Sequence, residues 1–250
     1  MPNPDDHELA AELAERAGVL LLELRERLLA DGVEAKQLKD AGDRASHELL
    51  VAELAVRRPD DAVLSEEARA DERADTSRLT APRVWIIDPL DGTREYGEGR
   101  SDWAVHVALV EGGTPTAGAV ALPGLGLVLG TGEPPELPEA PEQLRVIVSR
   151  SRPPAEALTI AAALDAELVE MGSAGAKAMA ILRGEADVYP HSGGQYEWDS
   201  AAPVAVATAA GLSCTRLDGS PLVYNREDPY LPDLLICRAE HAERVLAVLN

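Results

Sequence analysis

The chain has 250 residues, 46% of them hydrophobic, and its 44 acidic and 23 basic residues give a formal net charge of −21. Such a charge disfavours nucleic acids as partners, because phosphate backbones are bound by clustered basic residues. The sequence holds neither a run of about 18 apolar residues nor a basic segment ahead of an apolar one. We therefore expect no membrane span or membrane partner, no secretory signal, and a cytoplasmic location.

The first part of the chain, residues 1–132, predicts an α+β half. Leucines at helical spacing predict a helix over residues 7–30, and a second helix over 43–57 ends ahead of Pro59. Short apolar runs separated by glycine and proline turns predict a largely antiparallel sheet. Its strands are expected over residues 62–65, 84–88, 104–111, 117–122 and 126–131.

Residues 133–143 are acidic and proline-rich, which predicts an extended linker. Beyond it, residues 144–250 alternate strands with helices and predict an α/β half. Cys214 and Cys237 lie in apolar runs, where we expect buried thiols rather than a disulfide or a zinc site. The expected strands are 145–149, 168–171, 186–189, 213–216 and 234–237, and the expected helices are 153–164, 176–183, 199–211 and one that closes at Leu249.

The most informative stretch is WIIDPLDGT at residues 85–93. An apolar strand delivers Asp88 and Asp91, and the proline between them cannot donate a backbone hydrogen bond, so strand pairing is expected to stop at the acids. Carboxylate oxygens are ligands that Mg²⁺ prefers, and the backbone N–H groups of Gly92 and Thr93 can bind a phosphate. An ordinary turn after a strand is the alternative.

A related pattern, D-x-D-G-T, marks haloacid-dehalogenase-type phosphatases, in which the first aspartate is a nucleophile. Here two residues, Pro89 and Leu90, separate the acids. The additional residue changes the directions in which the two side chains leave an extended backbone. We therefore discount the aspartyl-nucleophile mechanism.

Two further acidic elements accompany this motif. Glu66 and Glu67 follow the short apolar run 62–64, and Asp199 opens an alanine- and valine-rich segment typical of a buried helix. Taken singly, the glutamates are explained as solvated charges and Asp199 as a helix N-cap. Gathered in one place, four or five carboxylates would repel one another unless cations neutralised them. The full set therefore indicates a metal site.

The three acidic blocks resemble signatures of the inositol monophosphatase/fructose-1,6-bisphosphatase superfamily of metal-dependent, lithium-sensitive phosphatases. Those signatures are G/S-E-E, W-I-I-D-P-x-D-G-T and W-D-x-A-A, and the resemblance covers most of the chain. The stretches DPLDGTREY at residues 88–96 and EWDSAA at 197–202 are most similar to the nucleotide branch, the CysQ-type phosphatases. Tyr96 stands where Phe is commoner, and Ser65 where many relatives have Gly.

The resemblance implies a mixed α/β (α+β) fold, a layered α-β-α-β-α sandwich with the site between its two halves. It also implies two or three Mg²⁺ ions per site and a possible homodimer. Most metal ligands would come from the first half, and the Trp-Asp motif and substrate contacts from the second. Glu67 would either lie behind the direct ligands or contact a metal through water. The implied ligands are Glu66, Asp88 and the carbonyl of Leu90 for one metal, and Asp88, Asp91 and Asp199 for the other.

Catalytic roles are implied for Asp43, Glu66 and Thr93, which would orient the attacking water and take its proton. Asp43 matches an upstream family aspartate that supports a further, weaker metal and pairs with Thr93. Its alternative role is to cap the helix over residues 43–57, which would contribute roughly 1 kcal/mol.

Substrate contacts are implied around the same acids. Lys177 either reaches the nucleotide or is a surface lysine, and Arg150 and Arg152 are candidates for a second phosphate or the base. Residues 193–196 are expected to form a flexible lip. The implied substrate-binding residues are Asp91, Gly92, Thr93, Gly172, Ser173, Ala174, Lys177 and Asp199. The five histidines, His7, His47, His106, His191 and His241, show no ligand spacing and receive no chemical role.

Three functions remain open, all with a small phosphate ester as the partner. The first is Mg²⁺-dependent hydrolysis of the 3′-phosphate of 3′-phosphoadenosine 5′-phosphate, and of its 5′-phosphosulfate analogue, by metal-activated water. The second is hydrolysis of inositol 1-phosphate or fructose 1,6-bisphosphate. The third is phosphate binding without catalysis. A dianionic ester resists attack by water unless cations neutralise it, so the acid set favours catalysis.

Overall fold

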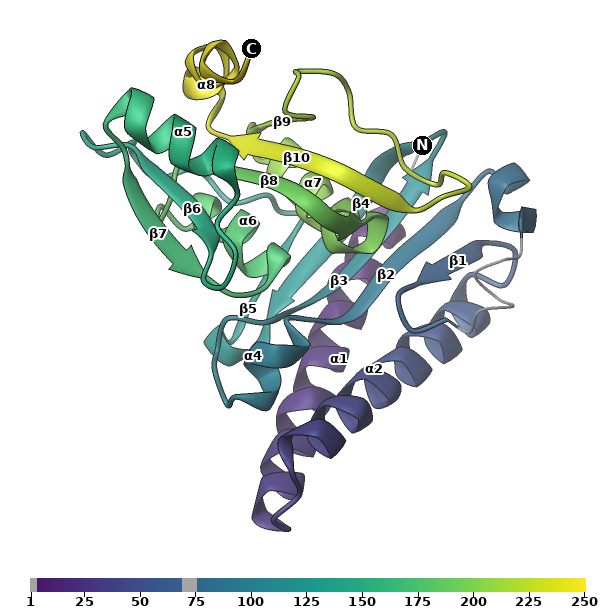
Figure 1. The fold of residues 1–250 in the computed structure, drawn as a ribbon. Coiled ribbons are helices and arrows are strands. Elements are labelled where there is room, and N and C mark those ends of the chain that lie inside the picture. The colour runs from purple at the N-terminus through teal and green to yellow at the C-terminus, as the bar shows by residue number, and fades with distance from the viewer. Residues whose placement is uncertain (1–3, 69–75) are drawn as a thin grey trace.

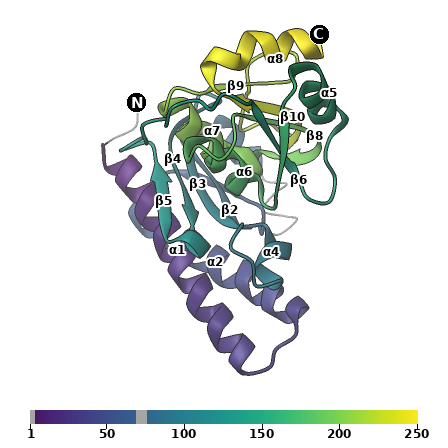
Figure 2. The same cartoon turned by 90° about the vertical axis from the view of Figure 1, so that its left-hand side faces the viewer.

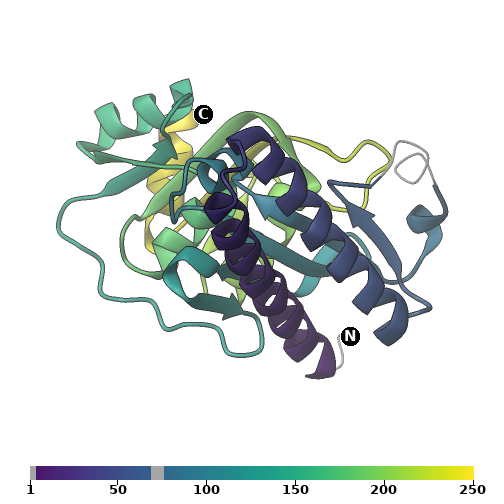
Figure 3. The ribbon, with the colours of Figure 1, turned by 90° about the horizontal axis from the view of Figure 1, so that it is seen from below.

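The computed structural model describes residues 4–68 and 76–250, which form five layers in the order α-β-α-β-α (Figures 1 and 2). This confirms the layered sandwich expected from the sequence. The first layer is a pair of long helices, α1 (Pro4–Ala30) and α2 (Ala35–Arg57), which lie across the outer face of the first sheet (Figure 3). Among the described helices, none combines the length and apolar character that crossing a membrane requires.

The first sheet has the strand order β1-β2-β3-β4-β5, and only its first pair is parallel. Three short helices interrupt its connections: η1 (Thr76–Thr80), α4 (Thr93–Gly97) and η2 (Pro123–Leu125). The strands are β1 (Ala62–Ser65), β2 (Val84–Asp91), β3 (Ala104–Glu111), β4 (Thr114–Leu122) and β5 (Leu127–Gly130).

The second sheet has the order β7-β6-β8-β10-β9, with β6 parallel to β7 and β8 and the remaining pairs antiparallel. Its strands are β6 (Arg145–Ser149), β7 (Glu167–Met171), β8 (Val188–Tyr196), β9 (Ser213–Thr215) and β10 (Tyr230–Cys237). The helices of this part are α5 (Ala155–Leu164), α6 (Ala174–Leu182), α7 (Glu197–Ala209), η3 (Ala239–His241) and α8 (Ala242–Leu249). Residues 133–143 join the two sheets without helix or strand.

Three apolar cores hold the layers together. One lies between α1, α2 and the first sheet, a second surrounds α6 and α7 between the sheets, and a third lies between the second sheet and α5 and α8. Trp85 and Ile87 of β2 join the first core, while Val84 and Ile86 join the second. Because successive strand residues point to opposite faces, a sheet covered on both faces needs this continuous apolar run.

Helix α2 begins at Ala35, so the expectation that a helix starts at Asp43 is wrong. Asp43 lies in the middle of the helix and cannot be its N-cap. Gly42 does not interrupt α2, because the helix packs closely there: a Cβ at Gly42 would lie 3.0 Å from Cε1 of Tyr96. Close helix packing therefore outweighs the low helix propensity of glycine at this position.

Strand β2 continues through Pro89 to Asp91, so the expectation that pairing stops at the acids is also wrong. Pro89 lies beyond the last β1 pair, at Ile87, and inside a register shift against β3, so no ladder bond requires its missing N–H. Residues 193–196 are likewise part of β8: Gln195 and Tyr196 pair with β10, and Gly193 and Gly194 lie at a register shift between the two strands.

Candidate active site

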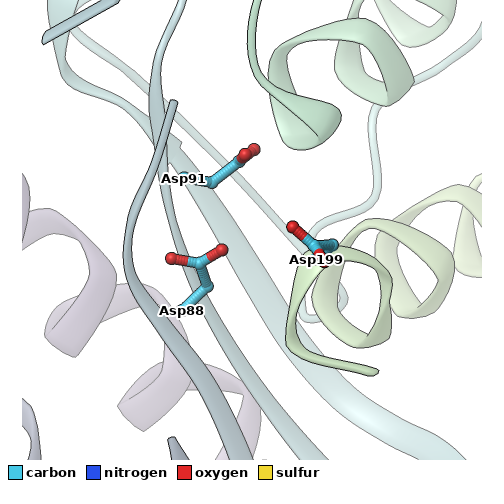
Figure 4. A group of neighbouring side chains, drawn as sticks. All are labelled: Asp88, Asp91 and Asp199. Atoms are coloured by element: carbon cyan, nitrogen blue, oxygen red, sulfur yellow. The ribbon is translucent and has the colours of Figure 1, made fainter. Parts of the chain in front are cut away.

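Three aspartates from distant parts of the sequence meet between the two sheets. Asp88 and Asp91 lie at the end of β2, and Asp199 lies in the first turn of α7 (Figure 4). Each offers a carboxylate oxygen within 4.8 Å of the others. Asp88 and Asp91 are buried and Asp199 is half-buried. The fold therefore brings together the acids of two separate sequence motifs.

An irregularity in β2 turns both of its acids toward this point. Asp88 pairs with His106 and Asp91 with Ala104, so three steps along β2 match two steps along β3. A bulge of one residue shifts the alternation of side chains, and Asp88 and Asp91 then face the same side. The bulge therefore offsets the additional residue between the two acids and brings their carboxylates to the same side, so the expectation that this residue changes their relative directions is wrong.

Asp88 has a carboxylate oxygen suited to a cation. Its Oδ1 accepts a 3.0 Å hydrogen bond from the N–H of Leu90, while Oδ2 is buried and accepts no hydrogen bond from the part of the protein that the structure describes. An unpartnered buried carboxylate oxygen is costly unless a positive charge approaches it. A free carboxylate oxygen of this kind is a ligand that fits Mg²⁺.

Glu66 joins the cluster at the end of β1 and lies close enough to Asp88 to share a hydrogen bond when one of them is protonated. Burial raises the pKa of Glu66 and of Asp199 to about 7, and nearby carboxylates add to the effect. Burial also raises the pKa of Asp88 well above its usual range. Without cations, the site thus favours protonated acids.

Asp91 differs from its neighbours because donors surround it. Its carboxylate accepts hydrogen bonds from the hydroxyl of Ser173, from the N–H of Ala174 at 3.1 Å and from the N–H of Gly175 at 2.6 Å. Although burial alone would raise the pKa of Asp91, His106, Ser173 and Gly175 lower it to about 2. Asp91 is therefore charged and tied to the start of α6.

Asp43 and Thr93 lie together beside this cluster. The Thr93 hydroxyl donates to the carbonyl of Leu90 at 3.2 Å and also contacts the Asp43 carboxyl. Burial, followed by the charge of Glu67, raises the pKa of Asp43 to about 7. Glu67 lines a separate surface pocket with Asp43, which sets it apart from the three aspartates.

Asp199 is not the N-cap of its helix, because α7 begins at Glu197. Asp199 is the third helical residue, and its Oδ2 accepts a 2.6 Å hydrogen bond from the N–H of Tyr196, as in a capping box. Glu197 points elsewhere and accepts hydrogen bonds from the N–H groups of Asn225 and Arg226. This glutamate holds a loop rather than facing the site.

A pocket of about 230 Å³ opens beside the aspartates and has both acidic and basic walls. Thr93 and Arg152 are not among its lining residues, whereas Arg150 is. Tyr96 is buried away from it, with its hydroxyl donating to the carbonyl of Leu21. The expected substrate-binding residues that line the pocket are Asp91, Gly92, Gly172, Ser173, Ala174, Lys177 and Asp199.

Lys177 is not a surface residue, so that alternative is wrong. The side chain is 5% exposed, and Nζ donates to the carbonyls of Gly172 at 2.5 Å and Ser173 at 2.8 Å. Burial lowers the pKa of Lys177. The N–H groups at the start of α6 are also occupied, because Gly172 donates to Asp102 and Gly175 donates to Asp91. The anions bound by these N–H groups are therefore two carboxylates of the protein itself, those of Asp102 and Asp91.

Sequence reasoning missed three residues of the site: His106, His191 and Gln195. His191 and Gln195 line the pocket, and each carries a buried side-chain atom without a partner among the described residues. His106 lies behind Asp91, with Nε2 3.2 Å from Oδ2. Only the pairing of β3 with β2 and of β8 with β10 brings these residues to the acids, and no local sequence signal marks them.

The model of the inositol monophosphatase family matches residues 5–250 of the chain. A 3′-phosphoadenosine 5′-phosphate phosphatase of Mycobacterium leprae is 50% identical, over 98% of this chain and 93% of that protein. The 3′(2′),5′-bisphosphate nucleotidase CysQ of Escherichia coli K12 is 32% identical, over 76% and 81% of the two chains. The crystal structure of CysQ from Bacteroides thetaiotaomicron has a TM-score of 0.77 at 28% identity and covers 94% of this chain and 97% of that one.

Proposed function

Because the chain belongs to the inositol monophosphatase family and is therefore a phosphatase, we propose that it hydrolyses 3′(2′),5′-bisphosphate nucleotides. The reaction converts 3′-phosphoadenosine 5′-phosphate to AMP and phosphate, and the 5′-phosphosulfate analogue is a second substrate. The relatives named above support the substrate class. The observation that carries the chemistry is the convergence of Asp88, Asp91 and Asp199 at one point, beside a pocket that Asp91 and Asp199 line.

Magnesium is the proposed cofactor, with two or three ions per site. Glu66, Asp88, Asp91 and Asp199 would hold it, together with the carbonyl of Leu90. The unpartnered Oδ2 of buried Asp88 supports this assignment. When bound, Mg²⁺ supplies charge neutralisation for the phosphate and lowers the pKa of a water molecule.

Orientation and deprotonation of the attacking water are assigned to side chains of the protein. Glu66 and the Asp43–Thr93 pair orient the attacking water and take its proton, a contribution typically of about 10²–10⁴ in rate. The contact between Asp43 and the Thr93 hydroxyl supports this role. Thr93 in turn donates to the carbonyl of Leu90, so the proposed base lies directly beside a proposed metal ligand.

The basic residues of the pocket would bind the second phosphate of the substrate. Lys177 and Arg150 line the same pocket as Asp91 and Asp199, and the buried Nε of Arg150 has no partner in the described parts of the chain. In this structure Nη2 of Arg150 donates to Glu95 at 2.6 Å and to Glu98 at 3.0 Å. Binding energy from a remote phosphate can position the reacting one.

Phosphate release from 3′-phosphoadenosine 5′-phosphate tests the proposal. Purified protein treated with EDTA should release none, and added Mg²⁺ should restore turnover. Turnover that persists in EDTA would contradict the metal-dependent chemistry. A Mg²⁺-loaded protein that binds the nucleotide without hydrolysing it would favour phosphate binding without catalysis.

A further inference from the structure

His106 lies at the point where three segments of the site meet. It is fully buried on β3, directly opposite Asp88 in the β2–β3 ladder. Its Nδ1 is 3.0 Å from the carbonyl oxygen of Trp198, the residue before Asp199. Its Nε2 is 3.2 Å from Oδ2 of Asp91. One imidazole ring therefore contacts both the end of β2, which carries Asp91, and the start of α7, which carries Asp199.

The partners of the ring determine where its proton lies. A backbone carbonyl can only accept a hydrogen bond, so Nδ1 must carry a proton to bond to Trp198. Nε2 is then directed at Asp91. The orientation of the ring is fixed by the fold from both sides, as is usual for the groups that support metal ligands.

The first turn of α6 packs closely against the same ring. A Cβ at Gly175 would lie 2.0 Å from Nε2 of His106, a distance that no side chain can accommodate without rearrangement. Gly175 also donates its N–H to Asp91. The ring therefore fills the space that separates β3 from the first turns of α6 and α7, where the two halves of the acid cluster meet.

The acid cluster needs such a spacer because its members come from different layers. Asp91 belongs to the first sheet and Asp199 to the central helices, and their like charges repel one another. Asp91 is held by α6, whereas Asp199 depends on where α7 begins. The bond from His106 to the Trp198 carbonyl is a direct link between that helix start and the first sheet.

We propose that His106 is a positioning residue that sets the separation of Asp91 and Asp199 and thereby the affinity of the site for divalent cations. This inference deepens the proposed function and rests on it. In this proposal the ring contacts neither the substrate nor the cation. It acts through the two aspartates.

The test is Mn²⁺ binding to the full chain, followed by the electron paramagnetic resonance signal of free Mn²⁺. His106→Val removes both contacts, and His106→Asn keeps a donor that can reach the Trp198 carbonyl. His7→Val is a matched control, since His7 bonds to Thr131 outside the site. We expect H106V to bind Mn²⁺ about 10–100-fold more weakly than the wild type, H7V to be unchanged and H106N to recover part of the loss.

A folded H106V that binds Mn²⁺ within threefold of the wild type would overturn the proposal, and so would an H106N as weak as H106V. If the wild type binds no Mn²⁺, both this proposal and the proposed function fail. Should H106V not fold, the ¹⁵N NMR spectrum of the wild-type imidazole decides. A proton on Nδ1 supports the proposal, and a proton on Nε2 alone contradicts it.

Discussion

Asp91, at the end of β2, accepts a 2.6 Å hydrogen bond from the backbone N–H of Gly175 in the first turn of α6. This bond joins the first sheet to the central helix layer at the floor of the pocket. Asp91 is therefore a structural link as well as a proposed metal ligand. Asp88, three residues earlier, has a buried carboxylate oxygen with no such donor in the described structure. The two aspartates should respond to the same substitution in opposite ways.

The Asp88→Asn variant should make the metal-free protein more stable and reduce its activity. The amide keeps an oxygen for the Leu90 N–H and is neutral without taking up a proton, so the cost of burying or protonating a carboxylate at this position is removed. We expect the melting temperature in EDTA to rise by about 2–8 °C, as about 1–2 kcal/mol would produce. Mg²⁺ should raise the melting temperature less than it does in the wild type, and kcat should fall by at least about tenfold. A lower melting temperature in EDTA would contradict the account of Asp88.

The Asp91→Asn variant should instead destabilise the metal-free protein. An amide nitrogen at this position would face the N–H groups of Ala174 or Gly175, leaving a buried donor without an acceptor. Such a loss costs about 1–3 kcal/mol, which calorimetry in EDTA would detect. Ser173→Ala removes one donor to Asp91 and also the N-cap acceptor of the Ala176 N–H, so it should destabilise the protein as well. An Asp91→Asn protein as stable as the wild type would show that the α6 contact contributes little.

The stability of the metal-free protein should fall as the pH rises from about 5 to 8. Burial raises the pKa of Glu66, Asp199 and Asp43 from ordinary values of 4.5, 3.8 and 3.8 to about 7. The folded state therefore binds these protons more tightly than the unfolded state. That contribution is fully present below the unfolded pKa values and is lost as the pH passes through 7.

Mg²⁺ should reverse this trend, because it competes with the same protons for the same oxygens. We expect the rise in melting temperature that Mg²⁺ causes to be larger at pH 8 than at pH 5.5. Scanning calorimetry at both pH values, with EDTA or Mg²⁺, measures both effects. A Mg²⁺ stabilisation that is equal at the two pH values would mean that these acids do not hold the metal.

Lithium should inhibit the enzyme more strongly than sodium or potassium. The proposed metal ligands are oxygen atoms, and among them a small monovalent cation can replace one Mg²⁺ and retain the product. Initial rates with LiCl, NaCl and KCl at matched ionic strength and fixed Mg²⁺ provide the measurement. Equal inhibition by the three salts would contradict the proposal that one of the Mg²⁺ ions can be replaced by lithium.

Local signals in the sequence predicted most helices and strands and the acidic motifs, while the family resemblance implied the five layers and the proposed metal ligands. Apolar runs with period two or 3.6 mark elements, and the acids lie in short motifs that can be read without the fold. The one-residue insertion between Asp88 and Asp91 was visible, but its consequence was not. It became clear only when the register of β2 against β3 showed a bulge.

What the sequence could not predict depends on contacts between distant segments. The early start of α2 follows from close packing of Gly42 against Tyr96, and Lys177 is buried because its ammonium group binds the two carbonyls that precede α6. His106 and Gln195 reach the site through strand pairing. The division into halves at residues 133–143, the homodimer and the cytoplasmic location remain predictions.

The central claim is that a nucleotide bisphosphate is the preferred substrate, and its most direct test is a comparison of kcat/KM values. The substrates are 3′-phosphoadenosine 5′-phosphate, 3′-AMP, inositol 1-phosphate and fructose 1,6-bisphosphate, under identical Mg²⁺ and salt. We predict that the bisphosphate nucleotide exceeds the others by at least about tenfold, or roughly 1.4 kcal/mol of transition-state discrimination. Equal or faster turnover of inositol 1-phosphate or fructose 1,6-bisphosphate would contradict the nucleotide assignment while leaving the phosphatase chemistry in place.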